Sequence, residues 1–298
     1  MRTTGGARRW GWMFRMFKVF GTILLVSLIY AGFIYVRTLK NHPDFSLLNS
    51  TPFLREKMKI SVWLPLPEMS GSAVEAIVIS EDGGFYRHTG YDLSSIRDAV
   101  KTDILSLKFK RGASTITQQV MKNVFLNSEK SMTRKIEELA LAQEAEKAVT
   151  KDRLLEIYLN TAQFGANLFG LEAASLFYFH KRASELTAKE GAFLAMLLPN
   201  PVRYQRSFRD GKLTPYADRT ITSILLKMVD AEKMSLEEFN AEKAKPFTFE
   251  LIQEGTPTPV GDKISPSPSA ITHGQYQRLM LLSRLFSCSG GRTAVFPP

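Results

Sequence analysis

Residues 133–160, TRKIEELALAQEAEKAVTKDRLLEIYLN, decide the fold class of this chain. On both sides of Thr150 the stretch mixes apolar and charged residues in the manner of amphipathic helices. Nowhere does the chain show a strand-turn-strand alternation long enough to indicate a large sheet. We therefore predict a mainly α protein.

Capping residues predict where neighbouring helices begin. A Ser or Thr followed three residues later by Glu is the signature of a capping box. Ser114 is predicted to cap a helix over 115–126, and Pro199 to end the helix over 191–198. Two capping boxes are expected, at Ser72 with Glu75 and at Thr187 with Glu190.

The composition is that of an ordinary globular protein with excess positive charge. The 298 residues are 44% apolar and 23% charged, which is enough for a full core. The formal net charge of +10 indicates an anionic partner: nucleic acid, an acidic lipid surface or a phosphorylated substrate. With Cys288 as the single cysteine, neither an intramolecular disulfide nor a cysteine-based zinc site is expected. The four histidines are too scattered to indicate a metal cluster.

The N-terminus distinguishes among these partners. Residues 19–36 form an uncharged, mostly apolar run that spans about 27 Å as a helix, close to the hydrocarbon thickness of a bilayer. Five basic residues and no acidic one precede it, so the positive-inside bias places the N-terminus in the cytoplasm and the remainder outside. A buried soluble helix and a cleaved signal peptide are the alternatives. Because the run is long and no A-x-A-like site follows, we expect an uncleaved transmembrane helix and no nucleic-acid partner.

The rest of the chain divides by composition. Residues 38–70 have the prolines of an extended, loop-rich segment, and two helices are predicted within 217–245, the second in a capping box of Ser235 and Glu238. The apolar and basic stretch 276–286 is a loosely packed tail or a short amphipathic helix. The predicted organisation is a cytoplasmic basic segment (1–18), a transmembrane helix (19–36), a juxtamembrane linker (37–59), a central domain (60–205), a helical extension (206–253) and a Pro/Ser-rich linker and tail (254–298).

The first candidate for chemistry is EDGGFYRHTGYD, residues 81–92. Glu81 lies at the predicted end of an apolar helix and is followed by Asp82 and two glycines. Apolar neighbours raise the pKa of a carboxylate toward the range of a general base, and glycines let the chain turn sharply around it. The alternative is a solvated helix end.

The second candidate is RGASTITQQVMKNVFL, residues 111–126. At 100° per residue, Thr115, Gln119 and Lys122 fall within about 60° of one another on a helix. The helix start presents free N–H groups that favour phosphate, and Lys122 adds a full charge two turns later. The alternative is a capped amphipathic helix with polar outer positions.

The third candidate is RKIEELALAQEAE, residues 134–146. Glu138 is four residues after Arg134 and three after Lys135, so it pairs with either on a helix. The alternative is a set of exposed salt bridges, each worth a few tenths of a kcal/mol.

Together these stretches resemble glycosyltransferase family 51, the peptidoglycan polymerase module of class A penicillin-binding proteins and of monofunctional glycosyltransferases. The similar blocks occur in order over about residues 60–205: SEDGGFYRHTGYD, RGASTITQQVMKNVFL, TRKIEELALAQEAEKAVTKDRLLEIYLNTAQFG and AASLFYFHKRASELTAKEGAFLAMLLPNPVRY. The resemblance implies a lysozyme-like fold, with a cleft between a larger head and a smaller lobe that touches the membrane. It also implies a single-pass protein of the bacterial plasma membrane with its catalytic domain outside.

The resemblance implies that the protein binds lipid II and the growing glycan strand. It also implies a transfer reaction that inverts the configuration at C1 of the donor sugar. Glu81 is expected to deprotonate the acceptor hydroxyl, and Lys122, Arg134 and Lys135 to meet the leaving pyrophosphate. For Glu138, the second essential glutamate, three roles stay open: orienting these cations, binding a divalent ion, or assisting the donor side. No cofactor is required, and a magnesium or manganese ion is left open. The other residues at family motif positions are Asp82, Phe85, His88, Ser114, Thr115, Gln119 and Asn123. The residues expected in the membrane-facing lobe are Leu107, Lys108, Phe109, Lys110 and Arg111.

Three features depart from the family pattern. Gly83 and Gly84 stand where bulkier, often basic residues are common, which predicts a more flexible first motif. No S-x-x-K followed by K-T-G is present, so cross-linking is expected of separate transpeptidases or other wall proteins. Residues beyond 205 have no counterpart in the resemblance. The alternative functions are a lysozyme-like hydrolase and an inactive scaffold that binds lipid II.

Overall fold

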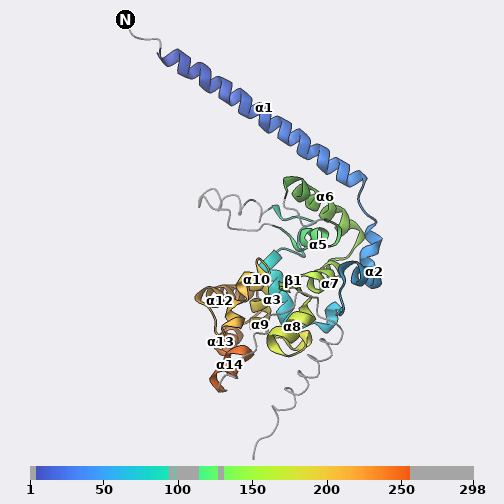
Figure 1. Ribbon diagram of the computed structural model, residues 1–298, viewed down its shortest axis with the longest axis vertical. Helices are drawn as coiled ribbons and strands as arrows, with labels where there is room; N and C mark the ends of the chain where they lie inside the picture. Colours follow the sequence, from blue (N-terminus) through green and yellow to red (C-terminus); the bar gives the residue numbers. More distant parts are fainter. Residues whose placement is uncertain (1–4, 94–96, 98–113, 127–130, 256–298) are drawn as a thin grey trace, which may run out of the picture.

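The computed structural model describes residues 5–93, 97, 114–126 and 131–255 (Figure 1). Over these residues the fold is mainly α, as predicted, with one antiparallel pair of short strands, β1 (Gln163–Gly165) and β2 (Leu168–Phe169). The α-helices are α1 (Gly5–Lys40), α2 (Thr51–Met58), α3 (Gly71–Asp82), α5 (Ile116–Phe125), α6 (Met132–Ala148), α7 (Lys151–Thr161), α8 (Leu171–Phe179), α9 (Ala188–Leu197), α10 (Pro201–Tyr204), α11 (Arg206–Arg209), α12 (Pro215–Asp230), α13 (Leu236–Ala244) and α14 (Thr248–Gly255). Short 3₁₀ helices lie at Phe45–Asn49, Leu66–Glu68 and Ala183–Glu185.

The caps of α3 and α5 differ from the prediction. Ser70, not Ser72, has the extended backbone of a cap, and its hydroxyl accepts from the N–H of Ala73. Thr115, not Ser114, caps α5 by accepting from the N–H of Gln118. The capping boxes of Thr187 with Glu190 and of Ser235 with Glu238 are confirmed.

The segment 38–70 is more helical than predicted. α1 continues to Lys40, and α2 occupies Thr51–Met58 in place of an extended chain. Ser50 caps α2, and Pro52 lies in its first turn, where a helix needs no N–H donor. The proline therefore starts this helix instead of preventing it.

α1 extends away from the rest of the protein (Figure 1). Within it, Arg15–Lys40 is long and apolar enough to cross a membrane, and no other helix in the described residues is. The C-terminal part of α1 packs on α6, where Ile34 is buried and the Tyr35 hydroxyl donates a hydrogen bond to Gln143. The apolar helix thus ends against a helix that carries candidate site residues.

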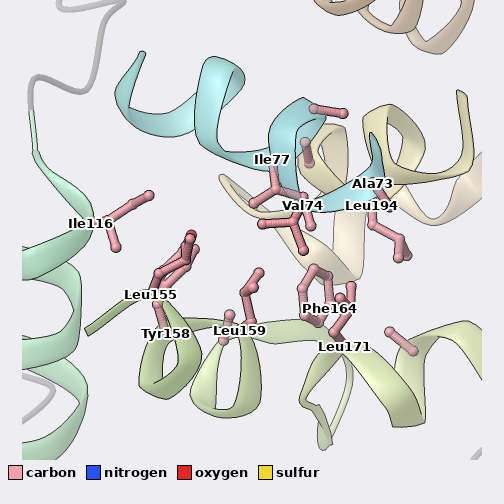
Figure 2. Close-up of a cluster of buried hydrophobic side chains, with 14 of the residues drawn as sticks. Ala73, Val74, Ile77, Ile116, Leu155, Tyr158, Leu159, Phe164, Leu171 and Leu194 are labelled. Carbon is pink, nitrogen blue, oxygen red and sulfur yellow. The ribbon is translucent and has the colours of Figure 1, made fainter. Parts of the chain in front are cut away.

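The core joins α3, α5, α7, α8 and α9. Figure 2 shows Ile77 of α3 and Leu194 of α9 above Leu159 and Phe164 of the α7–β1 segment, all in one buried cluster. α3 and α9 approach so closely that a Cβ added to Gly191 would lie 2.5 Å from the Cα of Ala73. The helix that carries Glu81 in its last turn is therefore packed closely against α9.

The helical extension after residue 205 belongs to this core. α12 packs on α3 and α9, and the rings of Phe247 and Phe249 stack 5.0 Å apart beside Phe193. Residues 256–298, which include most of the predicted linker and tail, lie outside the described residues. The same holds for the predicted lobe residues 107–111.

Candidate active site

Glu81 is held by an amide at the end of α3. The Nε2 of Gln119 on α5 donates a hydrogen bond of 2.9 Å to Glu81 Oε2. The Tyr158 hydroxyl on α7 donates in turn to Gln119 Oε1 at 3.4 Å, which fixes the orientation of the amide. Burial raises the pKa of Glu81, and the hydrogen bond from Gln119 and the charge of Lys122 offset only part of that rise. This carboxylate has the environment of a general base.

Asp82 joins the end of α3 to the start of α5. Its Oδ2 accepts the N–H of Ile116 at 2.9 Å, and its Oδ1 accepts His88 Nε2 at 2.8 Å. A carboxylate at a helix N-terminus is stabilised by the helix dipole. Asp82 therefore links the end of α3 to the start of the helix that carries Gln119, and His88 holds the Asp82 carboxylate in place.

The start of α5 is closed by the protein's own side chains. Buried Thr115 caps Gln118 and donates to the carbonyl of Gly90 at 2.7 Å. The N–H groups of Ile116 and Gln118 are therefore already bonded and not open to a phosphate. The predicted shared face holds for Gln119 and Lys122, but Thr115 turns away into the structure.

Glu138 lies buried between two cations on α6. Its side chain is 4% exposed, with Arg134 Nη1 at 2.8 Å from Oε1 and Lys135 Nζ at 2.8 Å from Oε2. The contact with Arg134 has the distance of an ion pair without the alignment of a hydrogen bond. Lys135 also donates to Ser114 Oγ at 2.6 Å and to Gln118 at 3.1 Å. These contacts centre on the buried carboxylate of Glu138, although Lys135 itself is 42% exposed. The group of Ser114, Gln118, Arg134, Lys135 and Glu138 is called here the brace.

A cavity of about 550 Å³ opens beside these groups. Four of the predicted site residues line it: Gln119, Lys122, Asn123 and Arg134. Among the described residues, no carboxylate oxygen lies within ion-pair distance of Lys122 Nζ, and burial lowers the pKa of that lysine. The other lining residues are Met58, Leu126, Tyr158, Thr161, Ala162, Gln163, Phe169, Leu198, Pro199 and Pro201. Gln119 is the link between Glu81 and this cavity.

Comparison with known proteins assigns the family. A family model described as Transglycosylase matches residues 50–229, more than half of the chain. The chain belongs to the transglycosylase family. The resemblance to glycosyltransferase family 51 and its lysozyme-like fold is thereby confirmed.

Three relatives of this transglycosylase are named biosynthetic peptidoglycan transglycosylase. The protein from Acinetobacter baumannii is 36% identical over 211 residues, 70% of this chain and 92% of its own. That from Acinetobacter baylyi is 43% identical over 148 residues, 50% of this chain and 66% of its own. That from Yersinia pseudotuberculosis is 44% identical over 145 residues, 49% of this chain and 60% of its own.

The other eight predicted residues of the transglycosylase site do not line the cavity: Glu81, Asp82, Phe85, His88, Ser114, Thr115, Lys135 and Glu138. Phe85 is fully buried, and Ser114, Lys135 and Glu138 belong to the brace, so none of the four lines the cavity. Sequence reasoning missed Tyr158, although its hydroxyl lies on an otherwise apolar face of α7. A tyrosine in such a position needs a hydrogen-bond partner, and this was the available signal.

The contacts of Glu138 bear on the divalent ion that the resemblance leaves open. Both oxygens of Glu138 are already in contact with cations. In the part of the chain that the structure describes, no group of three or more His, Cys, Asp or Glu side chains is placed to hold a metal. Of the three roles left open for Glu138, the geometry favours the orientation of cations.

Proposed function

We propose that this peptidoglycan transglycosylase lengthens glycan strands by using lipid II. One observation carries the proposal. Gln119 binds Glu81 and also lines the cavity that contains Lys122 and Arg134. Glu81 does not line the cavity itself, but its partner Gln119 does, so the base adjoins a cavity that holds a pair of cations. This arrangement suits transfer from a pyrophosphate donor.

Glu81 acts as the general base. Its carboxylate takes the proton of the acceptor GlcNAc 4-hydroxyl as that oxygen attacks C1 of the donor MurNAc, with inversion. The raised pKa of Glu81 makes it a better proton acceptor than an exposed glutamate. Because Glu81 must be ionised, activity falls as the pH falls through this raised pKa.

Lys122 and Arg134 receive the leaving group. The bond from C1 to the phosphate oxygen breaks, and the undecaprenyl pyrophosphate leaves with the electron pair. Positive charge in a partly dehydrated cavity stabilises this developing anion more strongly than charge in water. Lys122 suits the role because no carboxylate of the described residues neutralises it at close range.

The apolar helix α1 anchors the enzyme beside its lipid substrate. The positive-inside bias supports a cytoplasmic N-terminus and a catalytic domain on the outer face of the bacterial plasma membrane. Because the end of α1 packs on α6, the anchor leads directly to the helix of Arg134 and Lys135. The prenyl chain and the cations thus meet near the membrane.

Purified full-length protein in detergent, supplied with lipid II, tests the proposal. The wild type should form long glycan, and Glu81→Gln should lose about 10²–10⁴-fold in kcat because its amide cannot accept the proton. Glu75→Gln is the matched control, since Glu75 lies on the same helix in an exposed pair with Lys233. A hydrolase would instead shorten preformed glycan, and an inactive scaffold would bind lipid II without any product.

A further inference from the structure

Another ion pair with a buried carboxylate joins the end of α6 to the start of α7. Lys151 Nζ is 2.7 Å from Glu146 Oε1, and the side chains of Lys151 and Glu146 are 22% and 3% exposed. The same ammonium lies 4.5 Å from the centroid of the Phe85 ring. Thr117 donates a hydrogen bond of 2.5 Å to the same oxygen of Glu146. A cation, an anion, an aromatic ring and a hydroxyl thus meet at one point, called here the rear junction.

The rear junction connects four segments of the catalytic domain. Phe85 belongs to the loop after α3, Thr117 to the first turn of α5, Glu146 to the end of α6, and Lys151 to the start of α7. The next residue of α7, Asp152, accepts a hydrogen bond of 3.0 Å from the Tyr86 hydroxyl. The start of α7 therefore holds two consecutive residues of the loop that follows Glu81.

The junction is too buried to be an incidental surface pair. Glu146 Oε2 is buried and makes no hydrogen bond with the described residues, so Lys151 is the main compensation for this charge. Buried ion pairs often contribute little net stability compared with apolar side chains of similar size. Cation–π contacts and shared hydrogen bonds do, however, fix geometry. The arrangement is better explained by positioning than by stability.

Residues of the rear junction lie close in sequence to both Glu81 and Gln119, which share a hydrogen bond. Phe85 lies four residues after Glu81, and its N–H is bonded to the carbonyl of Asp82 at 2.9 Å. Thr117 lies two residues before Gln119 on α5. The contact of Asp82 with Ile116 sets the spacing of α3 and α5 at one point, and the rear junction sets it at a second.

We propose that Lys151 and Glu146 are positioning residues, which act through Phe85 and Thr117 to hold Glu81 against Gln119 for proton transfer. This inference rests on the proposed role of Glu81 as the base. Lys151 and Glu146 do not line the cavity, so they touch no substrate there.

Steady-state kinetics of the full-length enzyme with lipid II test the inference. Lys151→Met removes the charge and keeps the length of the side chain, whereas Lys151→Arg keeps both the ion pair and the contact with the ring. Lys147→Met is the matched control, because Lys147 forms an equally short pair of 2.7 Å with Glu144 but is 65% exposed. The double variant Glu146→Gln, Lys151→Met removes both charges and leaves an acceptor for Thr117.

For Lys151→Met we expect kcat to fall about 10- to 100-fold, with KM changed less than about twofold, because misplacement of the base affects the reaction more than binding. Water admitted by a loosened loop would stabilise ionised Glu81 and lower its pKa. The acidic limb of the kcat profile should therefore move to lower pH. Lys151→Arg should restore both kcat and the position of the limb, and Lys147→Met should change neither.

The double variant separates misfolding from misplacement. If it unfolds at the wild-type temperature but keeps the low kcat and the shifted limb, positioning is supported. If its kcat returns to the wild-type value, or if kcat in Lys151→Met falls only in proportion to the folded fraction with an unmoved limb, the inference is wrong. Parallel assays of the wild type and Glu81→Gln test the proposed function separately, since a fully active Glu81→Gln would overturn the role of Glu81 itself.

Discussion

The end of α3 and the first turns of α6 each present a glutamate, and their surroundings are opposite. Glu81 accepts a hydrogen bond from a neutral amide, and burial raises its pKa. Glu138 contacts Arg134 and Lys135, one at each oxygen. A carboxylate that is to take a proton must not be neutralised by a fixed cation, whereas one that orients cations must be. Glu81 is therefore suited to accept a proton, and Glu138 to orient cations.

The lysines show the same division. Lys135 uses its ammonium for Ser114, Gln118 and Glu138. Lys122 lines the cavity, and burial lowers its pKa from the ordinary value, so its charged form destabilises the fold. That cost is complete at pH values below the lowered pKa, and it declines as the pH rises from there to the ordinary pKa of a lysine. A charge kept at a cost to stability indicates a functional role.

The largest expected effect tests whether Lys122 and Lys135 have these different roles. Lys122→Met should lower kcat by about 10²–10³-fold, because it removes charge from the leaving-group side of the cavity. Its free energy of unfolding should stay the same or rise, since a half-buried charge is removed. Lys135→Met should instead lower the free energy of unfolding, because Ser114, Gln118 and Glu138 lose their partner. Kinetics and thermal unfolding of the two variants measure these effects. A stability loss confined to Lys122→Met would mean that Lys122, not Lys135, has the structural role.

The next effect concerns stability. Glu138→Gln should lower the free energy of unfolding by about 2 kcal/mol, measured by urea denaturation in detergent. This is less than the roughly 3–5 kcal/mol typical of a broken buried pair, because the glutamine can still accept from Lys135 and because Lys135 is 42% exposed. Unchanged stability would mean that Glu138 is not the centre of a brace.

The smallest effect concerns pH. The hydrogen bond from Gln119 lowers the pKa of Glu81 against the larger effect of burial. Gln119→Leu removes that hydrogen bond, so the pKa should rise further and the acidic limb of the kcat profile should move to higher pH. A limb that stays in place would show that Gln119 does not interact with the ionised base.

Sequence spacing predicted the parts of the site that lie on one helix. The turn of α5 correctly placed Gln119 and Lys122 on one side, and the spacing on α6 paired Glu138 with Arg134 and Lys135. Spacing defines angles around a helix axis but not which neighbour covers each side. It therefore did not show that Glu138 is buried, that Thr115 turns to Gly90, or that Tyr158 reaches Gln119.

The fold class was predictable for the same reason, and individual caps were not. Continuous amphipathic patterns indicate helices, and the boxes at Thr187 and Ser235 contain both partners within four residues. Local sequence favours Ser72 over Ser70, however, because only Ser72 is followed three residues later by a glutamate. Tertiary contact distinguishes them, because the Ser70 hydroxyl also donates to the carbonyl of Leu186 at 2.6 Å.

The pH dependence of kcat in Glu81→Gln and Glu138→Gln tests the central claim most directly. Glu138→Gln should retain the acidic limb, since Glu81 remains, and its basic limb should move to lower pH because Glu138 helps to keep Lys122 charged. Glu81→Gln should keep only a residual rate without an acidic limb. An acidic limb that persists in Glu81→Gln and disappears in Glu138→Gln would contradict the account, because Glu138 would then be the base.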